Sequence, residues 1–127
     1  MHLNYTNVMD IKELTKAEEQ VMQAIWSVEQ GFANEIVSAM VEPKPAYNTV
    51  LTVVRILEKK GFVAHETFNK SNRYYPLVSK EEYSRSMLGL LAQNYFGSSF
   101  RNMVSFLVDK KEVSLEDLEF LTKELEK

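Results

Sequence analysis

The chain of 127 residues contains no cysteine and only two histidines, four glycines and three prolines. Without cysteine it can form no disulfide bond, thiolate metal site or cysteine nucleophile. The same absence favours the reducing cytoplasm as its compartment. His2 and His65 lie far apart in the sequence, so no imidazole cluster is expected to bind zinc. We therefore expect neither a metal nor a cofactor.

Long apolar runs are also absent. The longest, such as residues 62–64 and 106–108, are far shorter than the ~20 residues that cross a bilayer. The N-terminal residues do not resemble a signal peptide, because asparagine and aspartate interrupt every apolar stretch. We expect a soluble protein that does not bind membranes directly.

Motifs that carry catalysis are missing too. The four glycines are too widely separated to form a phosphate-binding loop. His65 has no nucleophile near it in the sequence and is expected to be an exposed strand residue rather than a general base. The chain is therefore predicted not to be an enzyme.

Positive charge is unevenly distributed along the chain, whose net charge is −3. Residues 44–74 contain six lysines and arginines and two glutamates, which gives this segment a net charge of +4. Because a surface potential depends on where charges lie, one basic segment can attract phosphate groups even in an acidic protein. The overall acidity therefore does not exclude a nucleic-acid partner.

The first helix is marked by a capping box. Residues 1–13 are polar without a clear period and are predicted to form a flexible arm. Thr15 and Glu18 have the spacing of a capping box, and apolar residues then recur with helical period as far as Gly31. We predict a helix between Thr15 and Gly31.

A second, shorter helix is predicted from Asn34 to Val41. Pro43 and Pro45 follow it and are expected to end it, because proline cannot donate a backbone hydrogen bond. The side chains predicted to be buried are Ile36, Val37, Met40 and Val41.

The segment from Tyr47 to Lys60 is rich in β-branched residues, which favour strands. At 100° per residue, however, its apolar side chains share one arc, whereas a strand would mix polar and apolar groups on both faces. Gly61 then occupies the position of a helix-ending glycine. We predict a helix that buries Val50, Val53, Val54 and Leu57 and presents Asn48, Thr52, Arg55 and Lys59 on its opposite side.

Extended runs at 62–68 and 73–77 follow and bracket a polar, basic tip at 69–72, which predicts a β-hairpin. A capping box at Ser79 and Glu82 starts a long helix that runs through Tyr95. Two further helical segments are predicted, at 100–108 and from Ser114 onward. The fold class is therefore mainly α with a small β-hairpin.

Three helices and a hairpin in this order are the layout of a winged helix-turn-helix, whose third helix enters the DNA major groove. We predict an arm at 1–13, a winged-helix DNA-binding domain at 14–78 and a helical dimerisation region at 79–127. Asn48 and Thr52 can bond base edges, Arg55 can address guanine or phosphate, and Lys59 suits phosphate. The predicted DNA contacts are Tyr47, Asn48, Thr52, Arg55 and Lys59 on the helix and Lys70, Asn72 and Arg73 on the wing.

The C-terminal region carries much apolar surface on about three short helices, more than a compact winged core can cover. We expect it to form a homodimer, although the same helices could instead fold back on their own subunit. Two-fold symmetry would place two recognition helices one turn of DNA, or a multiple, apart. The predicted dimerisation residues are Met87, Leu91, Tyr95, Phe100, Met103, Phe106, Leu107, Leu118, Leu121 and Leu125.

Three segments resemble the penicillinase repressor family of bacterial regulators, which includes β-lactamase, methicillin-resistance and copper-transport repressors. They are Leu14–Trp26 (LTKAEEQVMQAIW), Tyr47–Val63 (YNTVLTVVRILEKKGFV) and Arg73–Tyr83 (RYYPLVSKEEY). The resemblance implies a homodimer that binds a palindromic operator and matches Thr49 and Thr52 to DNA-contacting positions. Family arginines fall at Leu51 and Ile56, so the operator sequence does not transfer.

The resemblance also implies partners that differ between branches of the family. In the β-lactam branch, a membrane sensor with a zinc protease domain leads to cleavage of the repressor. The aligned bond is Phe106–Leu107, although the asparagine usual before it is missing here. The copper-responsive branch has a cysteine-rich C-terminus, which this chain lacks.

The leading hypothesis is a sequence-specific DNA-binding transcriptional repressor. A polar outer helix face can also be no more than a solvated surface. A winged-helix scaffold can dock a protein instead of DNA. A third alternative is a ligand-sensing regulator with a small-molecule site at the dimer interface, lined by Tyr83, Tyr95 and Phe100.

Overall fold

The structure is a computed structural model that describes residues 11–127, so most of the predicted arm at 1–13 lies outside the described residues. The chain divides into two compact units, one ending at Ser86 and the other spanning Met87–Lys127. The elements of the first unit are α2 (Lys16–Val28), β1 (Gly31–Phe32), α3 (Ala33–Ser38), α4 (Tyr47–Lys59), β2 (Val63–Phe68) and β3 (Ser71–Pro76). Helix α5 (Lys80–Tyr95) begins in this unit, and α6 (Phe100–Asp109) and α7 (Leu115–Leu125) belong to the second. The predicted fold class, mainly α with a winged helix-turn-helix, is confirmed.

Helix α2 begins at the predicted capping box. The Thr15 amide donates to Glu18 Oε1 at 2.9 Å, and the Glu18 amide donates to Thr15 Oγ1 at 3.2 Å. The two bonds satisfy amides that have no partner within the helix. Val21, Met22 and Ile25 form the buried side of the helix.

Helix α3 is shorter than predicted, because it ends at Ser38 rather than Val41. After Ser38 the backbone tightens, and the Met40 amide donates to the Val37 carbonyl at 3.0 Å. The Lys44 ammonium caps the carbonyls of Ser38 and Met40, at 2.9 and 2.5 Å. The prediction that Val41 is buried is wrong, because the chain has left the helical path there and the side chain is 86% exposed.

Helix α4 confirms the prediction from periodicity, despite its β-branched residues. Val50, Val54 and Leu57 are almost fully buried, while Val53 is only half-buried. Helix α4 ends at Lys59, and Gly61 follows with φ of 84°. Tertiary burial of the apolar face therefore outweighs the local preference for strand.

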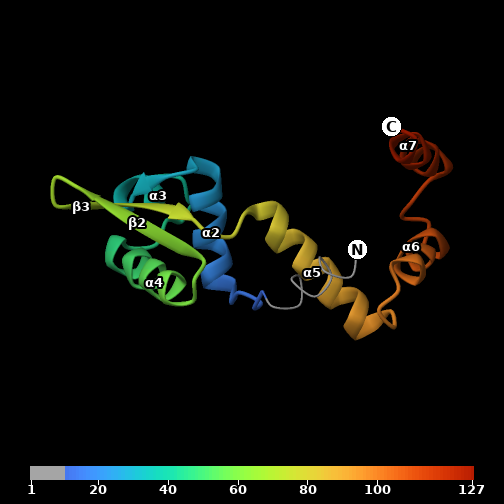
Figure 1. The fold of residues 1–127 in the computed structure, drawn as a ribbon, viewed down its shortest axis with the longest axis horizontal. Helices are drawn as coiled ribbons and strands as arrows, with labels where there is room; N and C mark the ends of the chain where they lie inside the picture. Colours follow the sequence, from blue (N-terminus) through green and yellow to red (C-terminus); the bar gives the residue numbers. More distant parts are fainter. Residues whose placement is uncertain (1–10) are drawn as a thin grey trace. The chain divides into compact units, whose positions relative to one another are not determined.

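The sheet has the order β1-β3-β2, with both pairs antiparallel. Phe68 pairs with Ser71 across a two-residue turn, Asn69 and Lys70, which have φ of 49° and 69°. The expected four-residue tip at 69–72 is therefore wrong, because Ser71 and Asn72 belong to β3. We call residues 63–76 the wing; its tip projects beyond α3 and α4 in Figure 1.

Tyr83, at the start of α5, is part of the core of the first unit. Its ring lies 5.9 Å from the Trp26 ring and 6.0 Å from the Phe62 ring, measured between centroids. Its hydroxyl oxygen accepts a hydrogen bond of 2.8 Å from the Leu14 amide. Because Tyr83 is buried and engaged, it does not line a ligand site with Tyr95 and Phe100, and that expectation is wrong.

The second unit consists of helices whose apolar side chains are largely uncovered. Ser99 and Ser114 cap the N-termini of α6 and α7, and their hydroxyls accept from the Asn102 and Asp117 amides. Neither helix contains a buried residue. Between residues 11 and 127, no helix has both the length and the apolar character needed to cross a membrane.

Candidate nucleic-acid interface

The outer face of α4 is open to solvent in the folded chain. Asn48, Thr52, Arg55 and Lys59 follow one another at helical spacing, and all four are exposed. Tyr47 and Thr49, at the start of the helix, are exposed as well. The rest of the described chain therefore leaves every predicted contact residue of α4 accessible to a partner.

The Thr52 side chain is bonded to the backbone of its own helix. The Thr52 hydroxyl donates to the Asn48 carbonyl oxygen at 2.9 Å. In this geometry the Thr52 hydroxyl can accept a further hydrogen bond from a base amino group. The Asn48 amide can both donate and accept, which suits the paired groups of an adenine edge.

A hollow of about 230 Å³ lies between α4 and the wing. It brings together Tyr47 and Arg55 from the helix with Lys70 and Asn72 from the wing. Its lining has two cations and no carboxylate, which suits a phosphate group. Leu51, Ser71 and Tyr74 also line it. Sequence reasoning did not identify Phe32, Ala33 and Asn34, because β1 and the first turn of α3 are brought there only by tertiary pairing.

The other predicted wing residue, Arg73, does not line this hollow. Side chains alternate along a strand, so Arg73 lies on the face of β3 opposite to Asn72 and Tyr74. Its guanidinium carbon lies 4.3 Å from the centre of the Phe68 ring. Asn72 is held differently, because its Oδ1 accepts a bond of 3.0 Å from the Thr67 hydroxyl.

Two polar contacts fix α4 against its neighbours. Lys60, directly after the helix, pairs with the buried Glu18 of α2. Burial alone would raise the pKa of Glu18, but hydrogen bonds from Lys60 and the Thr15 amide outweigh it and hold the pKa below its ordinary value. His65 of β2, exposed as predicted, lies 2.5 Å from the Glu58 carboxylate of α4.

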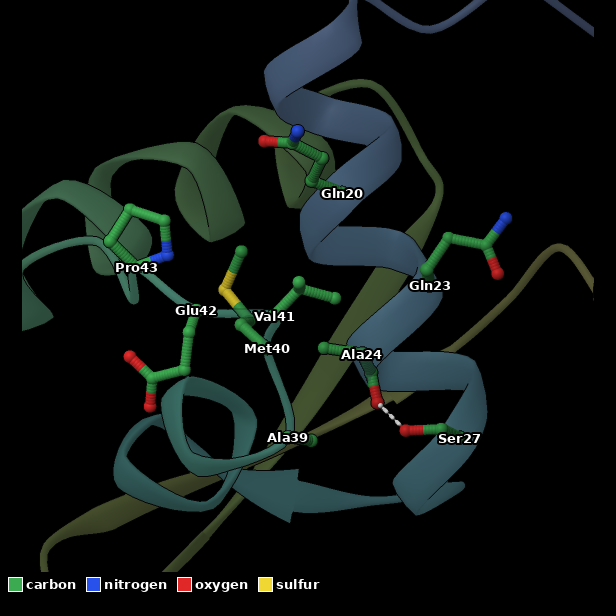
Figure 2. A pocket seen from close by; sticks show the side chains of 9 residues that line it. All are labelled: Gln20, Gln23, Ala24, Ser27, Ala39, Met40, Val41, Glu42 and Pro43. Atoms are coloured by element: carbon green, nitrogen blue, oxygen red, sulfur yellow. Dashed lines mark hydrogen bonds between the residues drawn. The ribbon is translucent and has the colours of Figure 1, made fainter.

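A second hollow of the first unit, of about 580 Å³, lies between α2 and the chain that follows α3 (Figure 2). Its walls are largely apolar, and the Ser27 hydroxyl is already bonded to the Ala24 carbonyl at 2.8 Å. The Gln23 amide points away from Met40 and Pro43 in Figure 2. The hollow thus lacks the convergent polar groups of a specific ligand site. Across residues 11–127, no three metal-ligating side chains gather in one place.

Comparison with known proteins agrees with this geometry. The family model described as penicillinase repressor matches residues 14–127. The chain belongs to the penicillinase repressor family. The methicillin resistance regulatory protein MecI of Staphylococcus aureus (strain N315) is 28% identical over 116 residues, which cover 91% of this chain and 94% of MecI. MecI of Mammaliicoccus sciuri matches with the same identity and coverage.

A solved relative has the same fold in the winged unit. The DNA-binding domain of the repressor BlaI superposes with a TM-score of 0.50 and 25% identity. The match covers 58% of this chain and 92% of that domain.

Proposed function

We propose that this member of the penicillinase repressor family is a homodimeric transcriptional repressor that binds a palindromic operator through α4 and the wing. The observation that carries the proposal is the open outer face of α4 beside the basic hollow that it forms with the wing. Asn48, Thr52 and Arg55 would read base edges in the major groove. Lys59 and Lys70 would contact phosphates, which fix position rather than sequence.

Arg55→Glu tests the proposal most directly. The variant places a carboxylate in the hollow and on the outer face of α4, so we expect operator binding to fall at least a hundredfold. Lys80→Glu is the matched control, because Lys80 is equally exposed but lies in the first turn of α5. The operator is first selected from random duplexes with the wild-type chain. Wild-type affinity for Arg55→Glu, or selection of no sequence, would contradict the proposal.

The second unit supports the dimer. A groove of about 1000 Å³ runs between α5 and α6 within this unit, and its lining is mostly apolar. An isolated chain would leave this surface in water, which is unfavourable. A second copy of the chain would cover it. None of the predicted dimerisation residues is buried in the single chain, and Leu91, Tyr95, Met103, Phe106 and Leu107 line the groove.

We further propose that the repressor is cleaved at Phe106–Leu107 after a signal from a membrane sensor with a zinc protease domain. The bond lies inside α6, so a protease would need the helix to unwind locally. The Phe106 ring packs 5.5 Å from the Phe96 ring, and unwinding would cost that contact. In cells exposed to a β-lactam, a fragment that ends at Phe106 would support regulated cleavage. A repressor that stays intact while its target genes are expressed would contradict it.

The rival functions predict other results. A protein-docking module would bind no duplex at ~50 mM salt but would form a stable complex with a partner protein. Relatives named as regulatory proteins favour a regulator over an enzyme. A ligand sensor would need a site without Tyr83, and a thermal shift with a metabolite panel would reveal it.

A further inference from the structure

The tip of the wing carries an exposed aromatic ring. Phe68 is the last residue of β2, directly before the two-residue turn, and its side chain is 41% exposed. A two-residue turn with positive φ at both positions is a tight and well-defined connection. The turn therefore fixes the position of Phe68 at the end of the hairpin. Its apolar ring is partly exposed to water there.

Arg73 holds this ring from one side. Phe68 pairs with Ser71 and Glu66 pairs with Arg73, so Phe68 and Arg73 are diagonal neighbours on one face of the hairpin. The guanidinium lies over the ring at 4.3 Å, within the range of a cation–π contact. Arg73 is half-buried, while Phe68 at the tip remains open.

The position of the tip indicates that DNA is the partner that the exposed ring contacts. Lys70, in the turn next to Phe68, lines the hollow that α4 and the wing share with Arg55. The turn therefore lies beside the helix face proposed to enter the major groove, while Phe68 and Arg73 lie on the face of the hairpin opposite to Asn72 and Tyr74. The turn and its two flanking residues carry Lys70, whose charge a phosphate backbone attracts, and the nearest carboxylate on the Phe68 face is Glu66, which pairs with Arg73.

We propose that Phe68 contacts the minor groove beside each half-site, and that Arg73 is a positioning residue that holds its ring. An apolar ring that enters the minor groove partly unstacks the base steps, which costs least where these steps are easily deformed and no guanine amino group projects into the groove. The wing thereby gives the repressor a preference for A·T pairs at the flanks, separate from the bases read by α4. This inference rests on the proposed function.

The test compares operators that share their half-sites and differ only in the flanks. The flanks contain A·T, G·C or inosine·cytosine pairs; the last presents the G·C major groove but lacks the guanine amino group in the minor groove. The full-length chain is expected to bind A·T and inosine·cytosine flanks equally, and G·C flanks roughly tenfold more weakly. Phe68→Ala is expected to bind all three alike, and Phe68→Trp to retain the preference.

Several outcomes overturn the inference. If the wild-type chain binds the operator but treats all flanks alike, the inference fails and the proposed function stands. If Phe68→Ala keeps the wild-type preference, the ring does not read the groove, and a role in docking a protein becomes the better account. If the wild-type chain binds no duplex, both the proposed function and this inference fail.

Arg73→Met separates positioning from a direct phosphate contact. The variant keeps the stem and removes the charge, so we expect it to weaken the flank preference without changing the salt dependence of binding. Added to Phe68→Ala, it should have no further effect on the preference. Arg73→Lys, which restores a cation over the ring, should recover part of the preference. A salt slope smaller by about one per subunit in Arg73→Met would show a phosphate contact instead and overturn the positioning role.

Discussion

Lys60 donates hydrogen bonds to both carboxylate oxygens of Glu18, at 2.9 and 2.8 Å, and so joins the end of α4 to the start of α2. The Glu18 side chain is 7% exposed and the Lys60 side chain 34%. Glu18 also completes the capping box of α2. One carboxylate therefore both starts a helix and fixes the proposed recognition helix against the core.

Removing Lys60 should lower the free energy of unfolding more than removing the charge of Glu18. Lys60→Met leaves a buried carboxylate without its cation and is expected to cost about 3 kcal/mol. Glu18→Gln can still accept from the Thr15 amide and leaves Lys60 free to be hydrated, so its cost should be about 1 kcal/mol. Urea denaturation at neutral pH measures both. Equal losses would contradict the unequal burial of the two side chains.

The same pair predicts a pH dependence. Hydrogen bonds hold the folded pKa of Glu18 below its ordinary value of 4.5 despite burial. The pair's stabilisation is therefore complete above the unfolded pKa and is lost as the pH falls through the folded pKa. The difference in stability between wild type and Glu18→Gln should shrink from pH 7 to about pH 3. A constant difference over that range would contradict the assignment.

Tyr83→Phe removes the acceptor of the buried Leu14 amide while keeping the ring between Trp26 and Phe62. An unsatisfied buried donor costs about 1–3 kcal/mol, and we expect a loss in that range. Tyr47→Phe is the matched control, because Tyr47 is 49% exposed and lies outside the apolar groove, so its change should cost less than about 0.5 kcal/mol. Equal effects of the two substitutions would argue against the role of Tyr83 in the core.

Gly61→Ala tests the turn between α4 and the wing. Gly61 has φ of 84°, and nothing lies within 4 Å of an added Cβ, so the cost arises from the backbone alone. The expected loss is about 1 kcal/mol, with a smaller loss for Gly61→Asn, because asparagine tolerates this conformation better. Thermal denaturation of the two variants measures the difference. A loss for asparagine as large as that for alanine would contradict a purely backbone cost.

Leu91→Glu is expected to break the dimer, because it places a charge in the apolar groove between α5 and α6. Light scattering should then give the mass of a single chain, 14.7 kDa. Gln93→Glu is the control: Gln93 is exposed on the same helix but does not line the groove. A wild-type chain that is already monomeric at micromolar concentration would contradict the proposed dimer.

Salt dependence reports how many phosphates the dimer neutralises. If each subunit contacts roughly four, the logarithm of affinity should fall against the logarithm of salt with a slope of about −7. A slope near zero would contradict a phosphate-dominated interface. The measurement needs only the selected operator and a titration at several salt concentrations.

Local signals in the sequence determined the helices that matter most here. The capping boxes at Thr15 and Glu18, at Ser79 and Glu82 and at Ser114 and Asp117 are all formed, because each involves residues three apart. The apolar period of α4 identified its buried side and hence its open face, although β-branched residues favoured a strand. These features depend on neighbours in the chain and can therefore be predicted from it.

Contacts between distant residues were decided only by the tertiary structure. Gly31 pairs with Tyr74 to form β1, a strand of two residues that is too short to leave a periodic signal. Arg73 turned to the Phe68 face because the register of the two-residue turn placed Ser71 and Asn72 in β3. The burial of Tyr83 and the hollow between α4 and the wing depend on the same long-range packing, which no local spacing encodes.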